Sequence, residues 1–341
     1  MSRRRLPLVC ALAALALSPP SAAKPAGSWA LPQIQAVVGA GIMGTDVATF
    51  HPNDPLTRGA LAELVAGLTH VPTLPATNPA ATVTITGLDA RLVNALNLSP
   101  IAKLFQAGAK SAGLTPPSRF GSEAVARLLG LRINHPAAQD DLELLPNEVA
   151  TRAEAAYSGA QILKFSGFET QAVSNAAATF TLPTSTAWQQ RILRTAVRFI
   201  GYPYVWGGES ETTESPFGVQ AHGGFDCSGF VWRVYKLQQY PGGASLSSTL
   251  KGRTTYAMSG EVPASKRISF AKLQPADVLF FGAHGAKSKP AQVDHMGIYL
   301  GNGWFIHSSG YGVAIAQLAG WYRAKFAWAR RPLAEAGLST P

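Results

Sequence analysis

The amino-acid sequence predicts an α+β protein in which a mostly helical region precedes a domain of helices packed on an antiparallel sheet. In the first half, apolar residues recur at helical spacing in segments such as 33–43 and 122–131. In the second half, amphipathic helices over 188–200 and 226–237 precede short runs typical of strands, at residues 278–281, 295–300, 304–307 and 326–330. Helices followed by consecutive strands are typical of α+β folds.

The length and composition fit a globular protein of two domains. The chain has 341 residues, of which 47% are hydrophobic and 14% are charged. A chain of this length and hydrophobicity divides into domains that each bury a core. We expect a helical domain at residues 30–165, a linker at 166–186 and a second domain at 187–333. The linker is expected because its segment is rich in Ala, Ser and Thr and contains Pro183.

Residues 1–23 are predicted to be an export signal. Three arginines at positions 3–5 give a positive start, residues 6–17 form an apolar run, and residues 21–23 are small. The run is too short to span a bilayer, which takes about 20 residues. We therefore expect a secreted protein that has no membrane span once the signal is removed.

The cysteines point to one unpaired thiol in the mature protein. The sequence has two cysteines, and Cys10 lies inside the predicted signal. Cys227 then has no disulfide partner in an oxidising compartment, which indicates a reactive thiol or an intermolecular bond. The alternative is a buried and inert cysteine.

Charge is unevenly distributed along the chain. Residues 24–184 carry a net charge of −1, whereas residues 185–341 carry +8. A basic half attracts anionic polymers. Nucleic acid is excluded as a partner because the exported chain has no dense Lys/Arg stripe and no nucleic-acid-binding motif.

The first half contains a loosely repeated unit in which a loop leads into a capped helix. Thr57 is predicted to cap the first of these helices, because its hydroxyl can accept from a free backbone N–H. Thr151 and Glu154 have the spacing of a capping box at the start of another helix. A degenerate copy of the unit is expected at residues 101–114.

The repeated unit resembles the S-layer homology repeat, which is a wall-binding module. The resemblance lies in Asn53-Asp54-Pro55-Leu56-Thr57-Arg58 and in Ala150-Thr151-Arg152-Ala153-Glu154. It implies that Arg58 and Arg152 help to hold an anionic cell-wall polymer. The alternative is a set of ordinary capped helices without a polymer site.

Cys227 is the candidate nucleophile because it lies where a loop meets a helix, in Phe225-Asp226-Cys227-Ser228-Gly229. Free backbone N–H groups and the helix dipole favour negative charge at a helix start. We expect them to lower the pKa of the thiol and to hold the oxyanion of a tetrahedral intermediate.

Two histidines on a predicted hairpin are candidates for the rest of the catalytic group. Histidine can accept and return a proton near neutral pH. Residues 293–300 read as a strand, Gly301-Asn302-Gly303 as a turn, and residues 304–307 as the return strand. With all three turn residues in the loop, Gly297 faces His307, and His295 lies diagonally across on the same face. A register change of one residue would put the two histidines on opposite faces.

The second half resembles the NlpC-type peptidases, which are papain-like enzymes of bacterial cell walls. Four segments match in order: residues 201–208 (GYPYVWGG), 226–229 (DCSG), 273–278 (LQPADV), and 295–301 (HMGIYLG) with 305–307 (FIH). The resemblance implies Cys227 as nucleophile, His295 as base and His307 as the polar third residue. It also implies that Tyr204, Asp226 and Ser228 line the substrate site. Long links at residues 209–224 and 282–292 depart from the family pattern.

The resemblance implies an exported peptidoglycan endopeptidase without metal or organic cofactor. Its substrate would be the stem peptide, cut between D-glutamate and the diamino acid. Two alternatives stay open: an amidase or acyltransferase with the same triad, and a catalytically silent wall-binding protein. Asp226 could serve only as a helix cap, and Tyr204 could be a core aromatic. A metal site is disfavoured because the histidines match no known zinc-ligand spacing and a single cysteine cannot form a zinc cluster.

Overall fold

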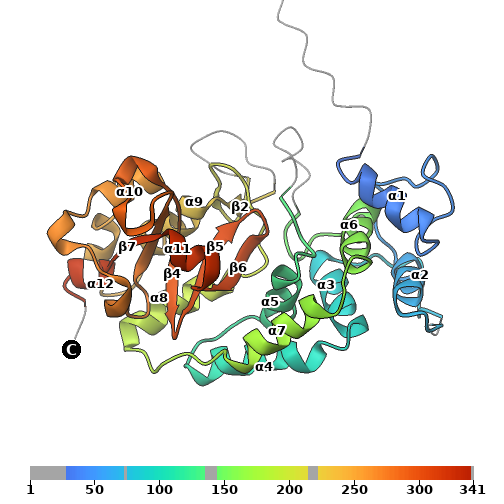
Figure 1. The fold of residues 1–341 in the computed structure, drawn as a ribbon, viewed down its shortest axis with the longest axis horizontal. Coiled ribbons are helices and arrows are strands. Elements are labelled where there is room, and N and C mark those ends of the chain that lie inside the picture. The colour runs from blue at the N-terminus through green and yellow to red at the C-terminus, as the bar shows by residue number, and fades with distance from the viewer. Residues whose placement is uncertain (1–27, 73–74, 135–143, 214–221, 339–341) are drawn as a thin grey trace, which may run out of the picture.

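The computed structural model describes residues 28–72, 75–134, 144–213 and 222–338. The predicted export signal, residues 1–23, lies outside these ranges. Within them, no helix combines the length and the hydrophobicity needed to cross a membrane. Figure 1 shows the helical region on one side and the sheet with its helices on the other.

The helical region consists of seven described helices: α1 (Leu31–Gly39), α2 (Arg58–Thr69), α3 (Ile85–Ala95), α4 (Ser99–Ser111), α5 (Phe120–Leu128), α6 (Arg152–Ile162) and α7 (Phe168–Ala178). Three of them, α2, α3 and α6, begin in the same way. The hydroxyls of Thr57, Thr84 and Thr151 precede these helices and accept from the backbone N–H three residues later. The caps predicted at Thr57 and Thr151 are therefore present.

The segments before these three helices form a closed ring of backbone hydrogen bonds. Leu56 N–H donates to Ala150 O, Ala150 N–H donates to Val83 O, and Val83 N–H donates to Leu56 O. The middle unit of the repeat is thus the one capped by Thr84. The expectation of a copy at residues 101–114 is wrong, because that segment lies in α4 and has no threonine cap.

The segment predicted to be a linker, residues 166–186, contains helix α7. This helix packs on α4 and buries Val173 and Ala177. Its alanine-rich composition favours helix formation, and the same composition suggested a flexible connection. The segment is therefore a packed element for much of its length.

The C-terminal domain has one antiparallel sheet with strands in the order β6-β5-β4-β3-β7, which confirms the predicted α+β class. Its strands are β3 (Val278–Gly282), β4 (Val293–Gly301), β5 (Trp304–Ser309), β6 (Gly312–Gln317) and β7 (Phe326–Arg330), and a separate pair is formed by β1 (Glu209–Ser210) and β2 (Gly224–Phe225). The α-helices are α8 (Ala187–Arg198), α9 (Cys227–Trp232), α10 (Thr255–Gly260), α11 (Gly320–Lys325) and α12 (Pro332–Glu335). A π-helical turn at Arg233–Leu237 continues α9, and short 3-10 turns occur at Ala244–Ser248, Ala264–Lys266, Phe270–Lys272, Gly285–Lys287 and Pro290–Gln292.

The β4–β5 hairpin has the register that the sequence predicts, but its turn has two residues instead of three. The turn proper is Asn302-Gly303, with φ of 49° and 79°, and Gly301 pairs with Trp304. A bulge at Leu300 absorbs the extra residue, so that Ile298 still lies opposite Ile306. Continued by one residue, this register places Gly297 opposite His307.

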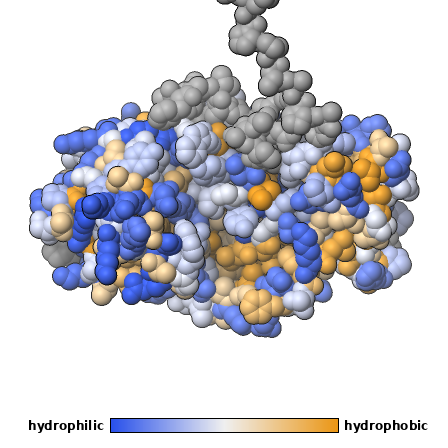
Figure 2. All heavy atoms as spheres, turned by 45° about the horizontal axis from the view of Figure 1, so that its top comes forward, coloured by the Kyte–Doolittle hydropathy of each residue, from blue (hydrophilic) through white to orange (hydrophobic). Residues whose placement is uncertain are grey.

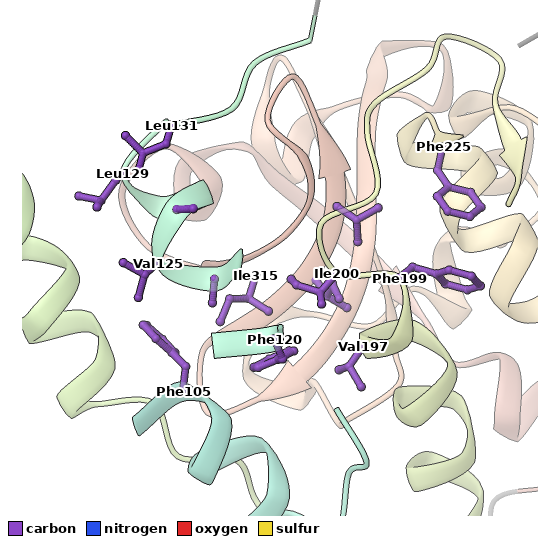
Figure 3. Close-up of a cluster of buried hydrophobic side chains, with 14 of the residues drawn as sticks. Phe105, Phe120, Val125, Leu129, Leu131, Val197, Phe199, Ile200, Phe225 and Ile315 are labelled. Atoms are coloured by element: carbon purple, nitrogen blue, oxygen red, sulfur yellow. The ribbon is translucent and has the colours of Figure 1, made fainter. Parts of the chain in front are cut away.

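The helical region and the C-terminal domain share a hydrophobic core. Figure 3 shows Phe120 and Val125 of α5 in one cluster with Ile200 and Ile315 of the C-terminal domain. The Trp304 ring lies 5.8 Å from Phe105 of α4 and 5.0 Å from Phe180, between ring centroids. The two parts therefore pack against each other through apolar side chains as well as through the connecting chain.

A buried arginine also joins the two parts. Arg127 of α5 donates to Gly201 O at 2.6 Å and to Tyr311 O at 2.5 Å, and it pairs with Glu123 at 3.3 Å. Burial first, and then the Asp89 carboxylate, raise the pKa of Glu123 to about 7. The junction therefore contains a carboxyl group that titrates near neutral pH.

The surfaces of the two parts differ in hydropathy. On the face shown in Figure 2, the side of the C-terminal domain is mainly hydrophilic, and apolar residues gather toward the helical region.

Candidate active site

Cys227 begins helix α9 and is held there by the residue before it. The Asp226 carboxylate caps the helix by accepting from Gly229 N–H at 2.5 Å, and it also accepts from Gly207 N–H at 3.0 Å. Helix α9 packs on β4 and β5. Cys227 is 8% exposed and is the free cysteine of the described residues. The thiol is thus fixed between a helix start and the centre of the sheet.

The two predicted histidines lie together on the sheet. His295 Nε2 and His307 Nδ1 are 2.7 Å apart, from neighbouring strands β4 and β5. His307 is buried, whereas His295 is half-buried. The hairpin register therefore produces the pairing that the sequence predicts, and the catalytic roles of the two residues stay a prediction.

Two contacts connect the cysteine segment to the histidine strands. The backbone of Met296, the residue after His295, is close enough to the Cys227 thiol to act on its pKa. The Ser308 hydroxyl, next to His307, donates to Phe225 O at 2.6 Å. The candidate nucleophile and both imidazoles are therefore positioned by one packed unit of α9, β4 and β5.

The electrostatics of the site differ from the sequence prediction in one respect. Burial first, and then the Asp226 charge, raise the pKa of the Cys227 thiol to about 12, although backbone N–H groups act to lower it. The expectation that the helix start would lower this pKa overall is wrong, because desolvation outweighs it. Burial also lowers the pKa of His295 to about 4. The two shifts favour the neutral thiol and the neutral imidazole at neutral pH.

The pKa of His307 is also lowered, well below its usual value. Burial is the main cause, and the neighbouring His295 adds to it. Two adjacent imidazoles can form a hydrogen bond of this length only while one nitrogen donates and the other accepts. A neutral His307 can therefore fix the tautomer of His295.

Arg253 is a residue of this region that the sequence reasoning missed. Its guanidinium donates to Ser228 Oγ at 2.7 Å and to Gly208 O at 3.1 Å, and it pairs with Asp226 and Glu209. This network holds the loop before α9 against the helix start. The sequence signal was weak, because Arg253 lies 25 residues after Ser228 in a segment without an obvious motif.

Of the predicted substrate-lining residues, Asp226 and Ser228 are tied into this network. The Ser228 hydroxyl also donates to Asp226 at 2.9 Å. Asp226 is therefore a helix cap, which was one of the two readings of the sequence, and its part in substrate binding stays a prediction. Tyr204 is half-buried beside Trp206, which is 78% exposed. The long link at residues 282–292 folds as two short 3-10 turns before β4.

The two arginines predicted to hold wall polymer lie in the helical region and have different surroundings. Arg58 is exposed and lines a cavity of about 520 Å³ together with Arg91 and the Thr82–Thr84 segment. Arg152 instead donates to Phe50 O at 2.7 Å and stacks over the Phe50 ring. Arg58 is thus placed to meet a ligand, whereas Arg152 helps to hold its own loop.

The site residues do not form a metal cluster. Across the part of the chain that the structure describes, no group of three or more His, Cys, Asp or Glu side chains is arranged to hold a metal ion. His222 pairs with Glu148 of the helical region at 2.8 Å.

Comparison with protein families supports both resemblances. The model of the NlpC/P60 family matches residues 201–331, and the model of the S-layer homology domain matches residues 23–62. The first match spans the segments from Gly201 to the last strand. The second covers only the first of the repeated units.

Several curated relatives match the C-terminal part. A probable peptidoglycan endopeptidase LytE of Bacillus subtilis is 38% identical over 128 residues, which are 38% of this chain and 29% of the relative. The bifunctional muramidase/DL-endopeptidase CwlT of Bacillus subtilis is 32% identical over 134 residues, which are 39% of this chain and 33% of the relative. The chain thus spans about a third of the length of these relatives.

Solved structures also match. An NlpC/P60 family protein from Bacillus cereus is 28% identical, with a TM-score of 0.32, over 45% of this chain and 42% of that chain. The resemblances predicted from the sequence are confirmed by the family matches. Residues 201–331 are therefore an NlpC/P60 family domain, and the helical region before them begins with an S-layer homology domain.

Proposed function

We propose that this protein is an exported, wall-associated peptidoglycan endopeptidase that works by a Cys-His-His thiol mechanism. The observation that carries the proposal is the arrangement of a buried thiol at the start of α9 against β4, where His295 hydrogen-bonds His307 at 2.7 Å. The DL-endopeptidase and endopeptidase names of the relatives support the class of reaction.

The first step is the attack of the Cys227 sulfur on the carbonyl carbon of the scissile amide. As the S–C bond forms, the thiol proton passes to Nδ1 of His295, because its Nε2 is engaged with His307. The resting thiol is protonated, so proton transfer and attack are coupled. The tetrahedral intermediate then carries a negative oxygen.

The oxyanion lies near the start of α9. The N–H groups of Cys227 and Ser228 precede the first bond within the helix, which runs from Phe230 N–H to Asp226 O. Backbone N–H groups at a helix start are aimed at developing negative charge. They stabilise the intermediate when the substrate carbonyl is seated there.

His295 then returns the proton to the leaving amine, and the C–N bond breaks to give a thioester on Cys227. Water attacks the thioester with His295 as base, releasing the acid and restoring the thiol. His307 supports both steps by accepting a hydrogen bond from the Nε2–H of His295. The Nδ1 atom of His295 is then free to take up and return the proton of the reaction. No metal or organic cofactor takes part in these steps.

The substrate proposed is the stem peptide, cut between D-glutamate (or its amidated form) and the diamino acid. Support comes from the family resemblance of the C-terminal half. The +8 charge of residues 185–341 favours approach to anionic wall material.

A second activity, binding of anionic wall polymer, is proposed for the helical region. Arg58 is exposed beside Arg91 in a cavity of about 520 Å³ between the first two repeated units. Both guanidiniums suit carboxylate or phosphate groups. Arg58→Ala should weaken binding to purified walls directly. Arg152→Ala should weaken it only by destabilising the loop that Arg152 holds.

The test of the endopeptidase is mass spectrometry of a purified peptidoglycan digest with wild type and Cys227→Ala. We expect wild type to release fragments with a new diamino-acid amine and a D-glutamyl carboxyl, and the variant to release none while it still binds walls. An amidase would instead free the lactyl end of the stem, and an acyltransferase would need an added amine. Equal digestion by both proteins would contradict the thiol mechanism.

A further inference from the structure

Tyr322 is an aromatic residue that the catalytic scheme leaves unused. It lies on α11, the short helix that connects β6 to β7, and it is half-buried. Its ring packs on both catalytic histidines, with centroid distances of 5.2 Å to His307 and 6.2 Å to His295. The contact with His307 is edge-to-face, at an interplanar angle of 81°.

Tyr322 completes an aromatic wall around the two imidazoles. Its ring lies 4.9 Å from Phe305 and 5.5 Å from Phe281 between centroids. The same two phenylalanines touch the histidines directly: Phe305 lies 4.7 Å from His307, and Phe281 lies 5.7 Å from His295. Phe281 and Phe305 are held by the sheet, whereas Tyr322 comes from a connecting helix.

The packing around the histidines matters because, among the described residues, no carboxylate contributes to the pKa shift of either imidazole. Burial accounts for the lowered pKa of His295, and burial with His295 itself accounts for that of His307. In many triads a carboxylate holds the imidazole by charge and hydrogen bonding. Here the third residue is itself a neutral imidazole, so the orientation of the pair depends on neighbouring rings.

The hydroxyl of Tyr322 is not needed for this packing. Burial first, and then Tyr311, raise the pKa of Tyr322 to about 12, so the phenol stays neutral at working pH. The contacts of Tyr322 with the two histidines are made by its aromatic ring. A phenylalanine ring has the same shape and can make the same contacts.

We propose that Tyr322 is a positioning residue: its ring holds the His295–His307 pair in its hydrogen-bonded orientation and keeps water away from His307. This inference rests on the proposed endopeptidase function and adds a residue to it. An imidazole displaced by about 1 Å costs on the order of 100-fold in rate. Entry of water would also favour the charged forms of both histidines.

The variants that test it are Tyr322→Phe and Tyr322→Leu, with Trp321→Leu as the control on the same helix. Trp321 is 57% exposed and packs its ring on Tyr322. The readouts are kcat and KM on purified stem peptide, the pH dependence of kcat/KM, and histidine titration by NMR. Thermal unfolding shows whether each variant is folded under the assay conditions.

For Tyr322→Leu we expect kcat to fall on the order of 10-fold to 100-fold with KM changed less than about 3-fold. The acid limb of the pH profile and the NMR pKa of His295 should move upward. Tyr322→Phe should stay within about 2-fold of wild type, as should Trp321→Leu.

Wild-type kinetics and an unmoved pH profile in folded Tyr322→Leu would overturn the positioning role. Loss of activity in Tyr322→Phe would also overturn it, because the hydroxyl would then be the active part. Failure of wild type to cut any stem peptide would instead reject the endopeptidase itself. In that case the NMR titrations still decide whether Tyr322 shields the histidines.

Discussion

The buried carboxyl at the junction of the two parts gives a quantitative prediction about stability. Glu123 lies on α5 beside Arg127, and burial with the Asp89 charge raises its pKa to about 7 from 4.5. The folded protein therefore holds a proton on Glu123 at pH values where the unfolded chain has lost it. Stability from this group is present at low pH and is lost as pH rises through about 7.

Replacing the carboxyl by an amide should remove this pH dependence. Glu123→Gln keeps the shape of the side chain and cannot ionise. A pKa near 7 in the folded state and 4.5 in the unfolded state corresponds to roughly 2 to 3 kcal/mol between pH 5 and pH 8. The variant should therefore gain that much free energy of unfolding, relative to wild type, as pH rises across this range.

Several nearby charges act on the pKa of the Glu123 carboxyl. Asp89 on α3 raises its pKa further, whereas Arg127, Arg132 and Arg119 on and near α5 lower it. Arg127 keeps its hydrogen bonds to Gly201 O and Tyr311 O in the variant, so its guanidinium still has backbone acceptors. The attraction between Arg127 and ionised Glu123 is already included in the pKa of about 7, because Arg127 is one of the charges that lower it.

The assay is urea unfolding of wild type and variant, followed by tryptophan fluorescence at pH 5, 6, 7 and 8. Glu63→Gln, which removes an exposed carboxylate on α2, is the matched control. A difference in unfolding free energy between wild type and Glu123→Gln that stays constant within about 0.5 kcal/mol from pH 5 to pH 8 would refute the reasoning.

Three further predictions concern the catalytic region. Burial lowers the pKa of His295 to about 4 and raises that of Cys227 to about 12, so both groups are neutral between these values. When kcat/KM is measured against pH, its decrease on the acid side should therefore occur only near pH 4. His307→Ala should lower kcat on the order of 10-fold to 100-fold on stem peptide, and His307→Asn should lose less, because it can still accept from His295. Arg253→Lys should destabilise the fold by about 3 kcal/mol in urea unfolding, because a single ammonium cannot replace the guanidinium bonds to Asp226 and Ser228.

The pairing of His295 with His307 was accessible from the sequence because it follows from local rules. The strand pattern and the turn residues fixed which face of the hairpin carries His295 and His307. The bulge at Leu300 was not foreseen, yet it preserves the predicted register. Strand β6 was missed, because its alternation is carried by few large residues.

The parts that were missed depend on long-range packing. The repeat unit capped by Thr84 has no arginine after the threonine, so its motif is degenerate, and only the hydrogen-bond ring with Leu56 and Ala150 reveals it. Composition could not distinguish an alanine-rich linker from helix α7. The raised pKa of Cys227 arises from burial against β4, and no local pattern reports burial of that kind.

The most direct test is the capture of the acyl intermediate on Cys227. Wild-type protein mixed with purified stem peptide is quenched in acid within the first turnover, digested, and examined by mass spectrometry. We expect the peptide containing Cys227 to carry the mass of the N-terminal part of the substrate as a thioester. Cleavage that proceeds without this adduct, and that persists in Cys227→Ala, would contradict the proposal that this sulfur performs the reaction.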